Sequence, residues 1–233
     1  SCQRRRSSGS WCARQTCSTV PRMTRLEAAL TGSASTVWQE ALAGARWLVR
    51  HRVVGGLALI GGMASVGYML PFSILVLFAQ QQLGLDELGY GIVLAVSALG
   101  GLLGSFVTAP VRRRIGYRWT IVASLVAGSA SLLTLALTHS AVAAAALLAA
   151  YILHAVVWGI CATSLRQRLV PDELLGRVNA ASRVLGLIGL ALGSALGGVL
   201  ATLHIALPVL AGGAVFLLCA VVAVYLIRDI DTD

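Results

Sequence analysis

Three side chains capable of chemistry share one face of an otherwise apolar stretch. Tyr151, His154 and Trp158 occur at positions i, i+3 and i+7, which lie on the same side of an α-helix. His154 is the most polar of the three, and a histidine among apolar residues can carry a proton or bind a small molecule. The alternative is a neutral histidine that is hydrogen-bonded inside a helix bundle. The spacing leaves both interpretations open.

A second apolar stretch offers a comparable face. Ser65, Tyr68 and Phe72 recur at helical spacing, and Pro71 is a position at which the helix would kink. A cavity lined by such aromatic side chains and no carboxylate suits bulky, partly apolar molecules. The sequence has no nucleophile–base constellation, phosphate-binding loop or carboxylate pair, so we do not expect an enzyme or a cofactor.

The elements that must position these residues are membrane-spanning helices. Of the 233 residues, 58% are hydrophobic and only 12% are charged, about half the charged share of a soluble domain. The apolar residues form blocks of about 20, the length that crosses a bilayer. We expect an all-α integral membrane protein with a bundle of six transmembrane helices. The predicted spans are Val53–Ala79, Gly89–Ala109, Trp119–Leu137, Ala141–Ser164, Val184–Leu203 and Leu207–Ile227.

The arginines predict which way these spans run. The net charge of +9 comes with no lysine, and no arginine falls inside a predicted span. Arginines occur before the first span and in the second and fourth loops, whereas the other three loops have none. Basic loops stay in the cytoplasm, so we expect both termini to be cytoplasmic. This distribution argues against a nucleic-acid-binding face.

Outside the six-span domain at 53–227, the chain has little pattern. Residues 1–35 are rich in Arg and Ser, and we expect a disordered leader or a frame artefact, with an organellar transit peptide as the alternative. Residues 36–52 predict an amphipathic helix at the membrane interface, and 228–233 a cytoplasmic tail. The five cysteines form no CxxC pair, and we expect no metal site.

Two arginine-rich loops are candidate gating or anchoring elements. In the first, Pro110 should stop the second span, and a tight turn at Gly116 should follow. Its arginines could pair with carbonyls at helix C-termini or with acids of a partner, or they could act only as a positive-inside anchor. In the second, Pro171 should start a short surface helix that ends near Gly176, with arginine–acid pairs inside the loop. The residues concerned are Arg112, Arg113, Arg114, Gly116, Arg118, Arg168, Asp172 and Arg177.

Glycines recur every four residues in the fifth span and form a similar patch in the second. Small residues at this spacing let helix backbones approach closely. The second and fifth spans are therefore predicted to pack most tightly, either as static contacts or as surfaces that slide. The glycines are Gly100, Gly101 and Gly104 in the second span and Gly189, Gly193 and Gly197 in the fifth.

The order of these features resembles the C-terminal half of a major facilitator superfamily transporter, in the branch of bacterial macrolide and siderophore exporters. The resemblance covers roughly 37–233. It rests on EALAGARWLVRHR before the first span, YGIVLAVSALGGLLGSF in the second, RRRIGYRW after it, and RQRLVPDELLGRVNAASR leading into LGSALGGVLA. The last is the most specific motif.

The resemblance implies a proton-driven exporter built from two six-helix halves that rock around a central cavity. The first and fourth spans would line that cavity with Tyr68, Phe72, Tyr151, His154 and Trp158. The second and fifth would face the other half through their glycines. Where the family has an Asp in the turn after the second span, this chain has Arg113.

We therefore expect half of a secondary active transporter for drug-like or siderophore-like molecules in a bacterial plasma membrane. Its partners would be lipid, a small-molecule substrate, and a further six-helix half in the same or a separate chain, or a second copy. The alternative is a transport-incompetent membrane fragment or a partner-binding subunit.

Overall fold

The computed structural model describes residues 44, 46–48 and 50–226. The expected leader at 1–35 and tail at 228–233 lie outside these residues. The expected interfacial helix at 36–52 is described only in part: residues 44, 46–48 and 50 are helical. Leu48 is buried there in a small apolar cluster with Val54, Ala58 and Val178.

The first span is a broken helix, as its proline predicts. Helix α2 (Arg52–Phe72) ends one residue after Pro71, and the short helix α3 (Leu75–Gln81) begins three residues later. At the break, the backbone N–H of Ile74 donates to the carbonyl of Pro71, three residues earlier. This is the spacing of a 3₁₀ turn, whereas an α-helix bonds to the residue four positions earlier. Together α2 and α3 cover the predicted span Val53–Ala79.

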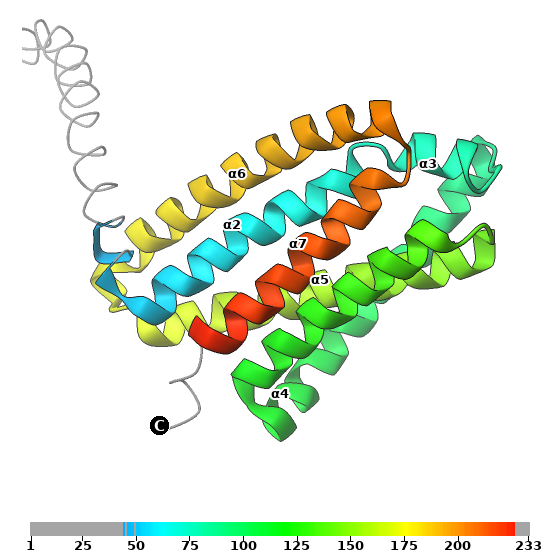
Figure 1. The fold of residues 1–233 in the computed structure, drawn as a ribbon. Helices are drawn as coiled ribbons and strands as arrows, with labels where there is room; N and C mark the ends of the chain where they lie inside the picture. The colour runs from blue at the N-terminus through cyan, green and yellow to red at the C-terminus, as the bar shows by residue number, and fades with distance from the viewer. Residues whose placement is uncertain (1–43, 45, 49, 227–233) are drawn as a thin grey trace, which may run out of the picture. The chain divides into compact units, whose positions relative to one another are not determined.

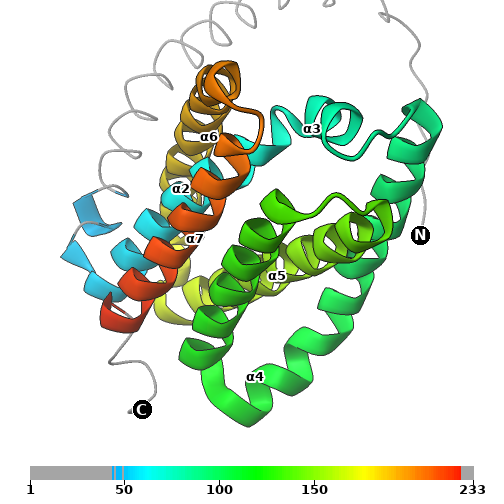
Figure 2. The ribbon, with the colours of Figure 1, turned by 45° about the vertical axis from the view of Figure 1, so that its right-hand side comes forward.

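The second and third spans form one helical element, α4 (Glu87–Leu137), with a sharp kink at Gly116. At 51 residues α4 would be about 75 Å long if straight, more than twice the thickness of a bilayer core. The kink folds it into two arms (Figure 2), which we call the first arm (before Gly116) and the second arm (after it). The prediction that Pro110 stops the second span was wrong, because the helix runs through Pro110 to Gly116.

The last three spans follow as α5 (Ala141–Leu169), α6 (Asp172–Leu203) and α7 (Leu207–Leu226). Pro171 starts α6, with Asp172 and Glu173 in its first turn, where acidic side chains favour the free N–H groups. The expected short surface helix ending near Gly176 is not separate: α6 continues through Gly176 into the membrane-length segment. Within the described residues, five helical segments are long and apolar enough to span a membrane, and the kink in α4 divides one of them in two.

The helices pack as two interlocked sets of three. The first set is α2 with the two arms of α4, and the second is α5, α6 and α7. Figure 1 shows α2 lying between α6 and α7, whereas α4 packs most extensively on α5 and α7. Each set therefore makes its main contacts with the other set rather than within itself.

Glycines let the helices of the two sets approach closely at two places. A Cβ on Gly193 would lie 2.6 Å from the carbonyl oxygen of Val66 in α2, and Gly189 and Gly197 make equally close contacts along the same helix. In the first arm of α4, a Cβ on Gly104 would lie 3.0 Å from the carbonyl oxygen of Leu153 in α5. Gly100 contacts the backbone of Ala149, also in α5.

These contacts correct the expectation that Gly100, Gly104, Gly189, Gly193 and Gly197 face another half. All five are buried against helices of this chain. The tight packing predicted for the second and fifth spans is confirmed, but their partners are α5 and α2.

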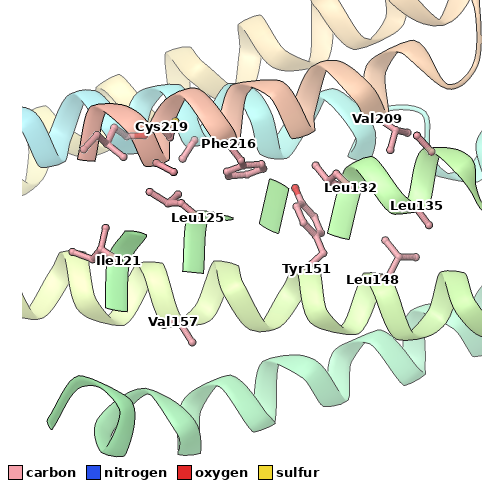
Figure 3. Packing of buried hydrophobic residues seen from close by; sticks show 14 of the residues in the cluster. Ile121, Leu125, Leu132, Leu135, Leu148, Tyr151, Val157, Val209, Phe216 and Cys219 are labelled. Atoms are coloured by element: carbon pink, nitrogen blue, oxygen red, sulfur yellow. Dashed lines mark hydrogen bonds between the residues drawn. The ribbon is translucent and has the colours of Figure 1, made fainter. Parts of the chain in front are cut away.

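The apolar core lies where α7 and the second arm of α4 meet α5. Figure 3 shows Tyr151 rising from α5 toward Phe216 of α7, with Leu125 and Leu132 of α4 beside them. Ser129 in the second arm of α4 links this arm to α7, since its hydroxyl donates to the carbonyl of Gly213 at 2.8 Å. The core therefore holds the predicted Tyr151–His154 segment firmly in place.

Candidate functional site

A pocket of about 140 Å³ lies where α2, α5, α6 and α7 come together. It contains three of the five predicted site residues: Tyr68, His154 and Trp158. Its full lining is Gly61, Ala64, Ser65, Tyr68, His154, Ala155, Trp158, Leu190 and Phe216. None of these side chains is an acid or an arginine, so the pocket offers aromatic surface and few polar groups.

The two aromatic faces predicted on α2 and α5 meet each other. Tyr68 stacks on Phe72 with ring centroids 4.9 Å apart and on Tyr151 at 5.7 Å. The Tyr151 hydroxyl donates a hydrogen bond of 3.3 Å to the backbone carbonyl of Tyr68. Because α2 and α5 touch at few other places, this aromatic row is their principal contact.

The five predicted residues differ in how much they can meet a bound molecule. Tyr68, Phe72 and Trp158 are partly exposed, whereas Tyr151 and His154 are each only 1% exposed. Within the pocket lining, His154 is therefore a buried wall, and Tyr68 and Trp158 are the more accessible aromatic side chains. Tyr151 lies outside the lining and packs behind His154.

His154 is inserted among apolar partners rather than held by hydrogen bonds. Its ring lies edge-on to Phe216 at 4.8 Å and tilted against Tyr151 at 5.0 Å. Its Cδ2, Cε1 and Nε2 atoms occupy the space beside Gly128, where a Cβ would lie 2.6 Å from each. Its Nδ1 is buried and makes no well-formed hydrogen bond with any described residue.

Two contributors to the site were not predicted. Phe216 comes from the last span, where no other aromatic residue lies at helical spacing from it to mark a face. Gly128 does not belong to the glycines that recur every four residues in the second and fifth spans. Its lack of a side chain makes room for the His154 ring, which the sequence alone did not indicate. Among the described residues no group of His, Cys, Asp or Glu side chains could hold a metal ion.

The arginine-rich turn is built as its glycine predicts. Gly116 has φ 77° and ψ 173°, a backbone conformation essentially restricted to glycine. Arg112 donates to the Tyr117 hydroxyl at 3.0 Å, and the guanidinium groups of Arg112 and Arg168 both lie over the Tyr117 ring. Arg113 and Arg114 are exposed.

Arg118 makes the kind of contact that the gating interpretation expects. It donates at 3.3 Å to the carbonyl of Val224, in the last turn of α7, where carbonyls lack helical partners. In the second loop, Arg166 donates to the Asn179 side chain at 3.1 Å, and Asp172 is exposed. The backbone of Arg177 lies against Gly44, at 2.9 Å from the position of a Cβ there.

The sequence profile of the Major Facilitator Superfamily matches residues 57–233, which is most of the chain. The chain belongs to the major facilitator superfamily. It is therefore a multi-pass membrane protein and a secondary transporter, in a family of transporters rather than enzymes. No curated protein matches the chain.

Membership in the major facilitator superfamily accounts for the interlocked helix sets. Each six-helix half in the superfamily contains two three-helix repeats of inverted topology. Here α2 and the two arms of α4 correspond to α5, α6 and α7 in that order. The glycine contacts obey this correspondence, because the second helix of each set packs on the first helix of the other.

Proposed function

We propose that this superfamily member exports bulky, partly apolar small molecules, and that they pass along the aromatic pocket. The observation that carries the proposal is the pocket lining, in which Tyr68, Trp158 and Phe216 supply aromatic surface. Aromatic walls with few polar groups favour planar or hydrophobic molecules over sugars and ions, whose hydroxyls and charges would be left without partners. Drug-like and siderophore-like compounds are the substrate classes that fit.

Export is driven by the proton gradient, and the coupling carboxylate lies outside the pocket described here. The lining contains no Asp or Glu. His154 is the only titratable imidazole in it, and its ring is packed against Gly128 and Phe216. A proton-binding acid must therefore come from the opposite wall of the transport pathway.

That opposite wall is a second six-helix half, in the same polypeptide, in a separate chain or in a second copy of this one. Large apolar side chains on the first arm of α4 and on α6 support this proposal. Phe106 is 78% exposed and Leu187 is 56% exposed. Leu187 lies one helical turn from the pocket-lining Leu190, so it extends the pocket wall toward the proposed second half. The membrane is the bacterial plasma membrane, with the arginine-rich turns on the cytoplasmic side.

Transport by vesicles tests the proposal. The chain is reconstituted together with the proposed second six-helix half, and uptake of a macrolide or a neutral aromatic dye into inverted vesicles is followed under an imposed proton gradient. We expect uptake that a protonophore abolishes. Uptake of sugars but not of these compounds would refute the substrate class, and uptake that persists with the protonophore would refute proton coupling.

The chain reconstituted alone separates the two interpretations of its assembly. We expect no uptake without the second half. Gradient-driven uptake by monomeric chain would contradict the half-transporter proposal. Binding of the second half without any uptake would favour the alternative, a partner-binding subunit.

A further inference from the structure

A second and larger cavity, of about 530 Å³, lies between α2 and α6 and is separate from the aromatic pocket. We call it the α2–α6 groove. Its walls are almost entirely apolar and include Leu59, Met63, Leu185 and Leu192. Only two lining residues can carry charge, His51 and Arg52, and both lie at the same end.

The α2–α6 groove faces away from the aromatic pocket. At about 100° per residue, Ile188 in the groove and Leu190 in the pocket lie roughly 160° apart around α6. A second half that completes the pocket would therefore approach from the other side of the α2–α6 pair. The groove instead opens where the bilayer would lie.

The length of the groove matches one leaflet. From Arg52 to Val66, α2 rises by about 21 Å. One leaflet counted with its headgroup region is about 20–22 Å thick. The charged end of the groove therefore falls at headgroup level, and the apolar end reaches toward the bilayer midplane.

The charged end is suited to an anionic phosphate. The Nδ1 atom of His51 accepts a bond of 3.4 Å from the backbone N–H of Val54, which leaves the ring N–H of Nε2 as a donor. Arg52 is exposed at the mouth, Arg50 beside it is exposed too, and no acidic side chain lines the groove. Basic pockets between helices on the cytoplasmic side bind anionic headgroups.

We propose that the α2–α6 groove binds one anionic glycerophospholipid, with its phosphate at Arg52 and His51 and an acyl chain between α2 and α6. The occupant is a lipid rather than a free phosphate, because most of the cavity is apolar surface that only a hydrocarbon chain would fill. Glycine helps to form the space: a Cβ on Gly62 would meet nothing closer than 3.6 Å.

Native mass spectrometry of the full chain tests this proposal. The chain in detergent is titrated with phosphatidylglycerol and with phosphatidylcholine of the same acyl chains. We expect one tightly retained phosphatidylglycerol per chain. Arg52→Gln should weaken retention about fivefold, the factor that one surface arginine contributes. Arg114→Gln removes the same charge from an exposed site outside the groove and should change nothing.

Thermal unfolding in the same mixtures keeps the test independent of mass spectrometry. Phosphatidylglycerol should raise the unfolding temperature of the wild type and of Arg114→Gln, and by less for Arg52→Gln, because a ligand stabilises the state that it binds. Equal retention of phosphatidylcholine would overturn the headgroup assignment. If Arg52→Gln and Arg114→Gln lost the same amount of stabilisation by phosphatidylglycerol, the site would not be the α2–α6 groove. If glycerol phosphate stabilised the chain as much as phosphatidylglycerol does, the ligand would not be a lipid.

Discussion

The ring of His154 in α5 fills the space that Gly128 in α4 leaves by having no side chain. A Cβ at Gly128 would lie 2.6 Å from three atoms of the imidazole. The two positions are thus coupled, although they are on different helices and only one of them has a side chain.

We predict that Gly128→Ala destabilises the protein by about 1–3 kcal/mol, because the added methyl overpacks the His154 ring. In His154→Ala the same methyl has room, so Gly128→Ala should cost much less there. Thermal unfolding of the two single variants and the double variant gives the coupling energy. Gly159→Ala in α5 is the control, since nothing lies within 4 Å of its Cβ. Strictly additive effects of Gly128 and His154 would contradict the contact.

We predict that Gly193→Ala loosens the fold of this chain by itself, by about 1–3 kcal/mol. Its Cβ would meet the carbonyl oxygen of Val66 at 2.6 Å and Met69 Cβ at 3.0 Å. The matched control is Gly198→Ala, in the same helix, where a Cβ meets nothing within 4 Å. Unfolding temperatures in detergent should fall for the first variant and stay or rise for the second. If only assembly with another half suffered, Gly193 would belong to an external interface after all.

We predict that Gly116→Ala costs about 1–3 kcal/mol, because alanine is strained at φ 77° and ψ 173°. Gly91→Ala in the first arm of α4 is the comparison, as its Cβ meets nothing within 4 Å and alanine favours a helix. Chemical unfolding in mild detergent measures both. Equal stability of the two variants would mean that the turn does not hold the two arms of α4.

We predict that Trp158→Ala raises the KM for an aromatic substrate about tenfold while leaving expression unchanged, because it removes one partly exposed wall of the pocket. Trp158→Phe should recover part of the affinity. Trp119→Ala is the control, since Trp119 is 51% exposed beside Arg118 and outside the pocket. Transport at several substrate concentrations in vesicles gives KM and maximal rate. A loss of maximal rate alone would place Trp158 outside substrate binding.

The features that could be predicted are those set by local sequence. Blocks of apolar residues define the spans, Pro71 defines the break between α2 and α3, and Gly116 defines the turn in α4. The aromatic faces of Tyr68 and Tyr151 were found from helical spacing, and they do meet.

The features that were missed depend on which helices become neighbours. Pro110 and Gly176 look like helix ends, yet both lie within continuous helices, since membrane helices tolerate such residues when their surroundings satisfy the backbone. The glycine ridge at Gly193 predicted close packing but could not name α2 as the partner. Phe216 has no aromatic neighbour at helical spacing in its own span, so its role follows only from the helix that it packs against.

The crossing of the two helix sets has a consequence for how the protein is made. Helix α2 emerges from the ribosome before α6, yet its closest glycine contacts are with α6, which is synthesised after α3, α4 and α5. Until α6 enters the bilayer, the face of α2 that includes the Val66 carbonyl has no packing partner from α6. Long-range pairing of this kind slows folding and prolongs exposure to aggregation. Truncations before α6 should therefore be degraded rapidly in cells, because α2 then has no partner on that face.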